Sequence, residues 1–118
     1  MPVVCFRGDI YYYDFGRGAG SIQSGTRPVV VVQNNVGNKH STTTIIAPIT
    51  SARKKATLPT HASIKPTQVK NLQSPFQNSM ILFEQLTTIN KDNLFNKIGW
   101  INLSTPYIEN ALRASLEL

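Results

Sequence analysis

The chain has 118 residues, which is enough for one domain with a modest core and too few for two. Hydrophobic residues make up 41% and charged residues 15%, so the composition excludes an intrinsically disordered chain. Twelve basic residues against six acidic ones give a net charge of +6, which favours nucleic acid or an acidic protein as partner.

The chain has a single cysteine, Cys5, so it can form no internal disulfide, which fits a reducing compartment. The apolar start reaches only to Arg7, which is too short for the hydrophobic region of a secretory signal. No stretch approaches the length of a membrane span. We therefore expect a soluble cytoplasmic protein.

The first half of the chain predicts three strands separated by loops. Residues 9–15, DIYYYDF, have the aromatic and β-branched composition of a strand. Four glycines in residues 16–25 prevent regular structure and predict a mobile loop. The apolar runs 28–33 and 42–50 have strand length, and the Asn-rich residues 34–41 between them predict a turn.

The second half continues with shorter elements. Residues 56–66 contain an alternating stretch between prolines, which permits only an edge strand. Residues 67–78 are polar and rich in turn formers. The apolar run 79–89 predicts another strand, residues 90–97 a single helical turn, and residues 98–103 a last short strand.

The C-terminal residues change to helical spacing. Thr105 is the candidate N-cap, Pro106 fits the first helical position and Glu109 lies in the first turn. Four apolar residues fall on one face of this helix: Ile108, Ala111, Leu112 and Leu116. The elements together predict one domain over residues 1–118, mainly β, whose short strands close into a barrel with the helix packed on it.

Metal, phosphate-loop and thiol chemistry are poorly supported by the side chains. No two of the six acids and two histidines have metal-ligand spacing, and there is no Cys-x-x-Cys pair. The glycine-rich residues 16–25 match neither phosphate-binding pattern, and Cys5 lacks the surroundings of a thiol nucleophile. We therefore expect neither a metal nor a cofactor.

The remaining candidates are polar residues where strands meet loops: Arg27, Thr50, Ser51, Glu84 and Gln85. An arginine at a strand start can offer its fork of donors to a phosphate, but Arg27 could equally pair with Asp9 or Asp14. The Thr50 and Ser51 hydroxyls are of a kind that usually bonds to nearby backbone in turns.

The other polar and aromatic candidates have simple structural explanations. Glu84 interrupts an apolar run, which fits a strand with one solvent-facing side. His40 and His61 fall in predicted loops or edges and are expected at the surface. The run Tyr11–Tyr13 alternates faces in a strand, so at least one ring points outward, where it could stack a nucleotide base.

Five segments, in this order and spacing, resemble the MazF/PemK-type toxins of bacterial toxin–antitoxin pairs. They are RGDIYYYDF (7–15), GTRPVVVVQNNVGNKHS (25–41), IAPITS (46–51), KKATLPTHASI (54–64) and ILFEQLTTINKDNL (81–94). QNNVGN is similar to the Gram-positive branch. The resemblance implies a small SH3-like β-barrel of the PemK/CcdB type with a C-terminal α-helix, working as a homodimer.

The resemblance also implies an activity. The family consists of ribosome-independent endoribonucleases, or mRNA interferases, that cut single-stranded RNA at a short sequence motif. They need no metal, because the 2′-hydroxyl attacks the adjacent phosphate and leaves a 2′,3′-cyclic phosphate and a 5′-hydroxyl. An acidic, partly disordered MazE-like antitoxin would hold the toxin inactive.

Residue roles follow from the same resemblance. Arg27 matches the catalytic arginine, and because a guanidinium is not deprotonated in proteins, charge stabilisation is favoured over base catalysis. Thr50 matches the catalytic threonine, whose hydroxyl would hold a phosphate oxygen. The residues expected to bind RNA are Phe15, Ser21, Gln23, Ser51, Glu84 and Gln85.

Two departures from the family pattern keep alternatives open. Ile22 stands where many relatives carry an acid, so proton transfer here would use water, and Thr87 replaces a basic residue. A gyrase poison of the CcdB type uses the same barrel without requiring Arg27 and Thr50. A degenerate RNA-binding barrel with weakened catalysis is a third possibility, which the Ile22 departure alone suggests.

Overall fold

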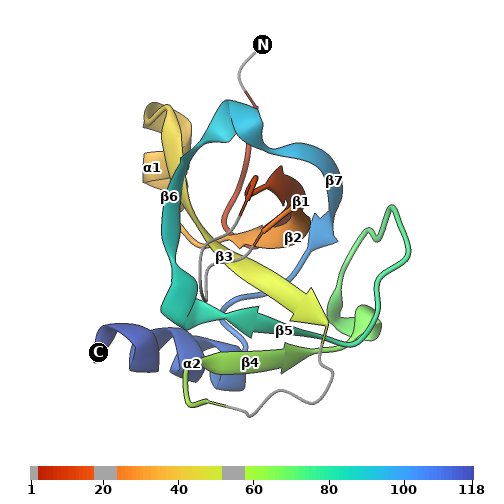
Figure 1. Cartoon of the computed structure of the whole chain (residues 1–118). Helices are drawn as coiled ribbons and strands as arrows, with labels where there is room; N and C mark the ends of the chain where they lie inside the picture. Colours follow the sequence, from red (N-terminus) through yellow and green to blue (C-terminus); the bar gives the residue numbers. More distant parts are fainter. Residues whose placement is uncertain (1–2, 18–23, 52–57) are drawn as a thin grey trace.

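The structure is a computed structural model that describes residues 3–17, 24–51 and 58–118 (Figure 1). Within these residues seven antiparallel strands form a curled sheet of order β4-β5-β3-β2-β1-β7, with β6 paired to β3. The strands are β1 (Asp9–Asp14), β2 (Thr26–Val31), β3 (Thr43–Ser51), β4 (His61–Ile64), β5 (Ser79–Leu82), β6 (Thr87–Asn90) and β7 (Phe95–Trp100). The helices are α1 (Asn35–His40) and α2 (Pro106–Leu116), and three short 3₁₀ turns are η1 (Pro66–Gln68), η2 (Phe83–Gln85) and η3 (Lys91–Asn93).

Strand β3 organises the sheet because it changes partners along its length. Its first half pairs with β6, its middle with β2, and its last three residues with β5. Pro48 lies between the β6 and β5 pairings, where a residue without an N–H is tolerated in a central strand. The end of β3 is thereby shared between two parts of the sheet.

The sheet does not close into a barrel through a continuous ladder. The edge strands β4 and β7 are joined indirectly, by one antiparallel bridge between Lys70, which follows β4, and Trp100 at the end of β7. The two backbone N···O distances of this bridge are 2.8 and 3.0 Å. The predicted mainly-β fold with a C-terminal helix is confirmed, and the sheet is curled rather than fully closed.

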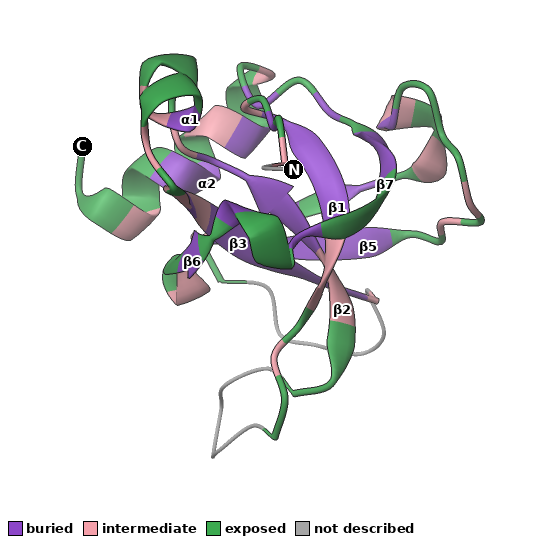
Figure 2. Ribbon diagram, turned by 90° about the horizontal axis from the view of Figure 1, so that it is seen from above, coloured by how far each residue is buried: buried purple, intermediate pink, exposed green. Residues whose placement is uncertain are grey.

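The buried side chains explain the apolar runs of the sequence (Figure 2). Val29, Val30 and Val31 are all fully buried, because β2 is a central strand with core on both faces. Val30 joins the larger cluster, which includes Ile108 and Ala111 of α2, while Val29 and Val31 join a smaller one on the other face. Helix α2 therefore covers one face of the sheet, as predicted.

The ends of α2 differ in detail from the prediction. Thr105 is at the N-cap position, but its hydroxyl donates to the Asn102 carbonyl (2.8 Å) and does not cap the helix. Pro106 and Glu109 lie in the first turn as expected. Leu116, predicted on the buried face, is 52% exposed because the last turn extends past the sheet.

Three other elements differ from the prediction. The turn expected at 34–41 contains the short helix α1, whose N-cap Asn34 accepts a hydrogen bond from the Gly37 N–H (2.8 Å). The run 79–89 is interrupted by η2, which separates β5 from β6. The last strand begins three residues earlier than expected, at Phe95, and ends at Trp100. None of the helices among the described residues is long and apolar enough to cross a membrane.

Candidate active site

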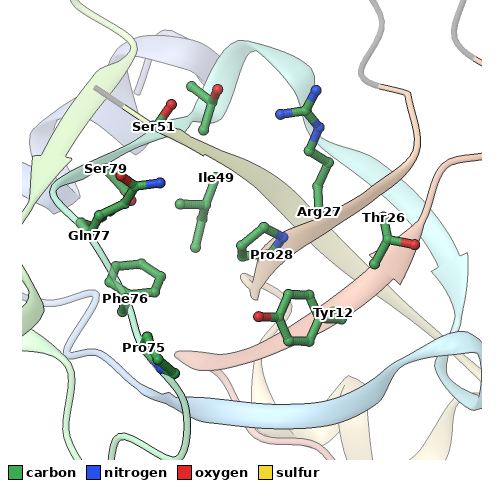
Figure 3. A pocket seen from close by; sticks show the side chains of 11 residues that line it. Tyr12, Thr26, Arg27, Pro28, Ile49, Ser51, Pro75, Phe76, Gln77 and Ser79 are labelled. Atoms are coloured by element: carbon green, nitrogen blue, oxygen red, sulfur yellow. Dashed lines mark hydrogen bonds between the residues drawn. The ribbon is translucent and has the colours of Figure 1, made fainter. Parts of the chain in front are cut away.

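A polar cavity of 260 Å³ opens where β1, β2 and the end of β3 meet the segment that leads into β5 (Figure 3). It is lined by Tyr12, Thr26, Arg27, Pro28, Ile49, Thr50, Ser51, Pro75, Phe76, Gln77 and Ser79. Arg27, Thr50 and Ser51, which were predicted from the sequence, are thus brought together in one place. Among the described residues that line the cavity, only Arg27 carries a formal charge.

Arg27 and Thr50 reach the cavity from neighbouring strands. The β2–β3 ladder ends at the pair Val29–Pro48, and Arg27 lies two residues before Val29 while Thr50 lies two residues after Pro48. On its other side Arg27 is opposite Tyr13 of β1. The Arg27 side chain is half-buried, and its Nε donates to the Ser24 carbonyl (3.1 Å), which holds the guanidinium at the cavity wall.

Arg27 is not part of a structural ion pair. All six acidic residues lie in the described part of the chain, and the ion pairs found there do not include Arg27. Asp9 pairs with Lys97 (3.2 Å) and accepts from the Phe6 N–H, while Asp14 accepts from the Gly16 N–H. The guanidinium therefore faces the cavity without a carboxylate partner, which favours the anion-binding interpretation over the pairing alternative.

The two hydroxyls at the end of β3 are also available to a ligand. Thr50 is opposite Met80 and Ser51 opposite Ser79, so β5 fixes both backbone positions. Within residues 3–17, 24–51 and 58–118, no hydrogen bond engages the hydroxyl of Thr50 or of Ser51. The expectation that these groups bond to nearby backbone is thus not met by the described residues.

Three of the other predicted RNA-binding residues, all within the described ranges, do not line this cavity. Phe15 packs edge-on against Tyr13, with ring centroids 4.8 Å apart. Glu84 and Gln85 belong to η2, at the opposite end of β5 from Ser79. Ser21 and Gln23, together with Ile22, lie outside the described residues.

Glu84 forms a polar contact with His61. Glu84 Oε2 lies 2.8 Å from His61 Nε2, and His61 Nδ1 accepts from the Leu58 N–H (3.3 Å). Because Nδ1 is an acceptor, Nε2 carries the proton and donates to Glu84. The His61 side chain is only 6% exposed, so the expectation of a surface histidine is wrong, whereas His40 is exposed at the end of α1. Thr87 is exposed and donates to the Gln85 carbonyl (3.0 Å).

The cavity wall opposite β3 comes mainly from residues that the sequence did not single out, and Tyr12 is the exception, because one outward ring was expected from the run Tyr11–Tyr13. Pro75, Phe76 and Gln77 belong to a segment predicted only as polar and turn-rich. Tyr12 is half-buried and faces the cavity, whereas Tyr11 is buried. The sequence signal that could have identified this wall is Phe76, an aromatic residue in an otherwise polar segment.

The described residues hold no group of three or more Cys, His, Asp and Glu side chains that could bind a metal ion. Cys5 is buried, and burial is the main reason that the pKa of its thiol is raised. The thiol is therefore protonated at neutral pH and remote from the cavity lining. The chemistry available in the cavity is that of one fixed cation among hydroxyl and amide groups.

The family model of the PemK-like, MazF-like toxin of type II toxin–antitoxin systems matches residues 6–115. Two relatives named Endoribonuclease MazF, from Staphylococcus epidermidis and Staphylococcus saprophyticus, are 42% and 40% identical over 113 residues, which cover 95% of this chain and 91% of each relative.

Solved structures agree with this match. An endoribonuclease in complex with its cognate antitoxin from Mycobacterial species superimposes with a TM-score of 0.74 at 25% identity, covering 97% of this chain and 96% of the other. A MazE–MazF structure from Deinococcus radiodurans gives a TM-score of 0.68 at 16% identity, covering 98% of both chains, and so supports the fold alone.

Proposed function

The chain belongs to the PemK-like, MazF-like toxins of type II toxin–antitoxin systems, and we propose that it is an endoribonuclease that cuts single-stranded RNA at a short sequence motif. The gyrase-poison alternative loses its support, because the matching relatives are named endoribonucleases. The observation that carries the proposal is the guanidinium of Arg27, free of any carboxylate, in one cavity with two hydroxyls that no described residue engages.

The proposed reaction is an internal transesterification. The 2′-oxygen of the ribose attacks the adjacent phosphorus, the new P–O2′ bond forms and the P–O5′ bond breaks. The products are a 2′,3′-cyclic phosphate and a 5′-hydroxyl, and the proton lost from the 2′-hydroxyl is balanced by the one that the leaving 5′-oxygen gains. No external water is consumed in this step, so the enzyme needs no group to activate one.

Arg27 and Thr50 would act on the phosphate in this reaction. Negative charge gathers on the non-bridging oxygens as phosphorus becomes five-coordinate, and a guanidinium can donate two parallel hydrogen bonds to them. The Thr50 hydroxyl, which lines the same cavity, can donate to the same oxygens. Ser51 lies one residue further and is the secondary donor in this arrangement.

Proton transfer would rely on water or on the substrate. The cavity lining contains no carboxylate and no histidine among the described residues, and Ile22 stands where many relatives carry an acid. Arginine remains protonated in proteins and is a poor general base. We therefore assign Arg27 the role of stabilising charge, with the proton of the 2′-hydroxyl passing to solvent.

The net charge of the chain and its structural relatives suggest which partners it binds. An antitoxin is the expected partner, because a structural relative was solved with its cognate antitoxin. A net charge of +6 suits both an acidic antitoxin and RNA. We further propose that the chain works as a homodimer, because a cavity of 260 Å³ contacts about one nucleotide and recognition of a sequence motif requires a longer groove. We also propose that it works in the cytoplasm.

Incubation of the purified protein with a long single-stranded RNA in EDTA tests the function. We expect discrete cuts whose 5′ ends carry hydroxyl groups, at rates that EDTA does not change. Intact RNA with and without added Mg²⁺ would reject the endoribonuclease. Cutting that EDTA abolishes and Mg²⁺ restores would reject metal independence while leaving the activity in place.

Thr50→Val removes a hydroxyl at nearly constant volume and shape. We expect kcat/KM for RNA cleavage to fall by about 100-fold, the scale of one lost donor to a developing oxyanion. Ser51→Ala is the matched control, and its loss should stay within about tenfold because Ser51 is the secondary donor. Equal activity of Thr50→Val and wild type would remove Thr50 from the mechanism.

A further inference from the structure

We propose that Phe76 and Gln77, together with Tyr12, form a base-selecting subsite beside Arg27, so that the segment before β5 determines part of the cleavage motif. The inference rests on the proposed function and adds to it the residues that choose the sequence. It concerns the cavity wall opposite the end of β3, to which neither Arg27 nor Thr50 belongs.

The first observation is a rigid aromatic wall. Tyr12 stacks on Phe95, with ring centroids 6.0 Å apart and planes inclined by 29°. Tyr12 and Phe76 both pack against the larger core cluster while also lining the cavity. Figure 3 shows Phe76 next to Pro75 and Gln77, with the Tyr12 ring across from it beside Pro28. Such fixed π-faces suit stacking of an unpaired base.

The second observation is an amide without a protein partner. The Gln77 carbonyl accepts a hydrogen bond from the Ser79 hydroxyl (2.7 Å), which holds the backbone before β5. The side-chain amide makes no hydrogen bond with any residue in the described ranges, and Figure 3 shows it directed into the cavity. A side-chain amide offers an NH₂ group as donor and a carbonyl oxygen as acceptor, the pair of groups needed to read a base edge.

The third observation is the separation of charge. Among the described lining residues Arg27 is the charged one and lies at one end with Ser51, whereas Pro75, Phe76 and Tyr12 at the other end are uncharged. A nucleotide has the same polarity, because its phosphate is anionic and its base is a neutral ring. The volume of 260 Å³ is slightly below the range of about 300–1,000 Å³ for drug-sized ligands, which fits a single nucleotide.

Mapping the cleavage sites of variants on a pool of random-sequence RNA tests the proposal. Gln77→Ala should relax the preference for one base next to the cut by roughly tenfold, the scale of one base-edge contact. Gln77→Glu, which offers acceptors only, should shift this preference toward guanine, whose Watson–Crick edge presents two adjacent donors. Phe76→Ala should lower kcat/KM by roughly 10- to 100-fold through lost stacking, and Phe76→Tyr should restore most of it.

Two matched controls lie on the same segment. Asn78 carries an exposed amide and Leu72 an exposed apolar side chain, and neither lines the cavity, so Asn78→Ala and Leu72→Ala should keep the wild-type motif and rate. An unchanged motif in both Gln77 variants, on a wild-type protein that cuts RNA, would overturn the subsite and leave the activity standing. A wild-type protein that leaves the pool intact would overturn the proposed function itself.

Discussion

We expect Arg27→Ala to lower kcat/KM for RNA cleavage by about 10³-fold or more and to leave the fold intact. Loss of one preorganised donor to a developing oxyanion costs about 10²- to 10³-fold, and an arginine placed on a phosphoryl group in transit is worth about 10³- to 10⁵-fold. The structure shows no second charged side chain on the described cavity lining that could replace it. Initial rates on a short RNA that contains one cleavage motif measure the effect.

The stability of the Arg27→Ala variant separates chemistry from folding. The hydrogen bond from Nε to the Ser24 carbonyl is the polar contact that the side chain makes with described residues, and no ion pair is lost. Its melting temperature should therefore stay within a few degrees of wild type. Arg27→Lys keeps the charge but not the planar fork, and should recover only part of the rate. If Arg27→Ala cleaved RNA at the wild-type rate, Arg27 would not be the residue that contacts the phosphate.

The sequence identified Arg27 as a candidate site residue but left two explanations for its charge open. The charged residue before a run of valines was compatible with an ion pair to Asp9 or Asp14 as well as with a phosphate contact. The structure argues against the ion pair, because Asp9 pairs with Lys97 and Asp14 accepts a hydrogen bond from the Gly16 N–H. The Asp9–Lys97 pair was not visible in the sequence, because it depends on how β1 and β7, far apart along the chain, are aligned, whereas the Asp14–Gly16 contact is a local turn.

The sequence pattern predicted the strands and helices better than it predicted which residues line the cavity. The valine run and the helical spacing after Thr105 have a periodicity that burial imposes directly, so β2 and α2 were found. The wall formed by Phe76 and Gln77 has no periodicity, because it depends on where an irregular segment returns to β5. The split of residues 79–89 by η2 was missed for the same reason, since an apolar run does not reveal a change of direction.

The Arg7–Gly8–Asp9 opening of the family resemblance has a structural explanation. Arg7 Nη1 donates to the Val32 carbonyl, and Asp9 accepts from the Phe6 N–H (2.9 Å). Between them, Gly8 donates its N–H to the Val31 carbonyl (2.8 Å), and its own carbonyl accepts from the Ile101 N–H (2.9 Å). These three residues thus join β2 to the segment that leads into α2, at a distance from the cavity.

Gly8→Ala should be the most destabilising of the substitutions considered. Gly8 has φ +95°, and an added Cβ would lie 2.4 Å from the Ile101 carbonyl oxygen, so the backbone of a buried junction would have to move. The conformational cost and the steric cost are each about 1–3 kcal/mol, which predicts a loss of roughly 3 kcal/mol or more in the free energy of unfolding. The melting temperature would fall by about 10 °C, measured by circular dichroism or calorimetry.

Gly16→Ala is the matched control for the steric part of this loss. Gly16 also has a positive φ, +66°, but an added Cβ would meet no atom within 4 Å. It should therefore cost only the conformational part, about 1 kcal/mol. If the two variants lost equal stability, the contact with Ile101 would contribute nothing and conformation alone would explain the glycine. A larger loss for Gly8→Ala instead shows that the close approach to Ile101 is what requires a glycine at this junction.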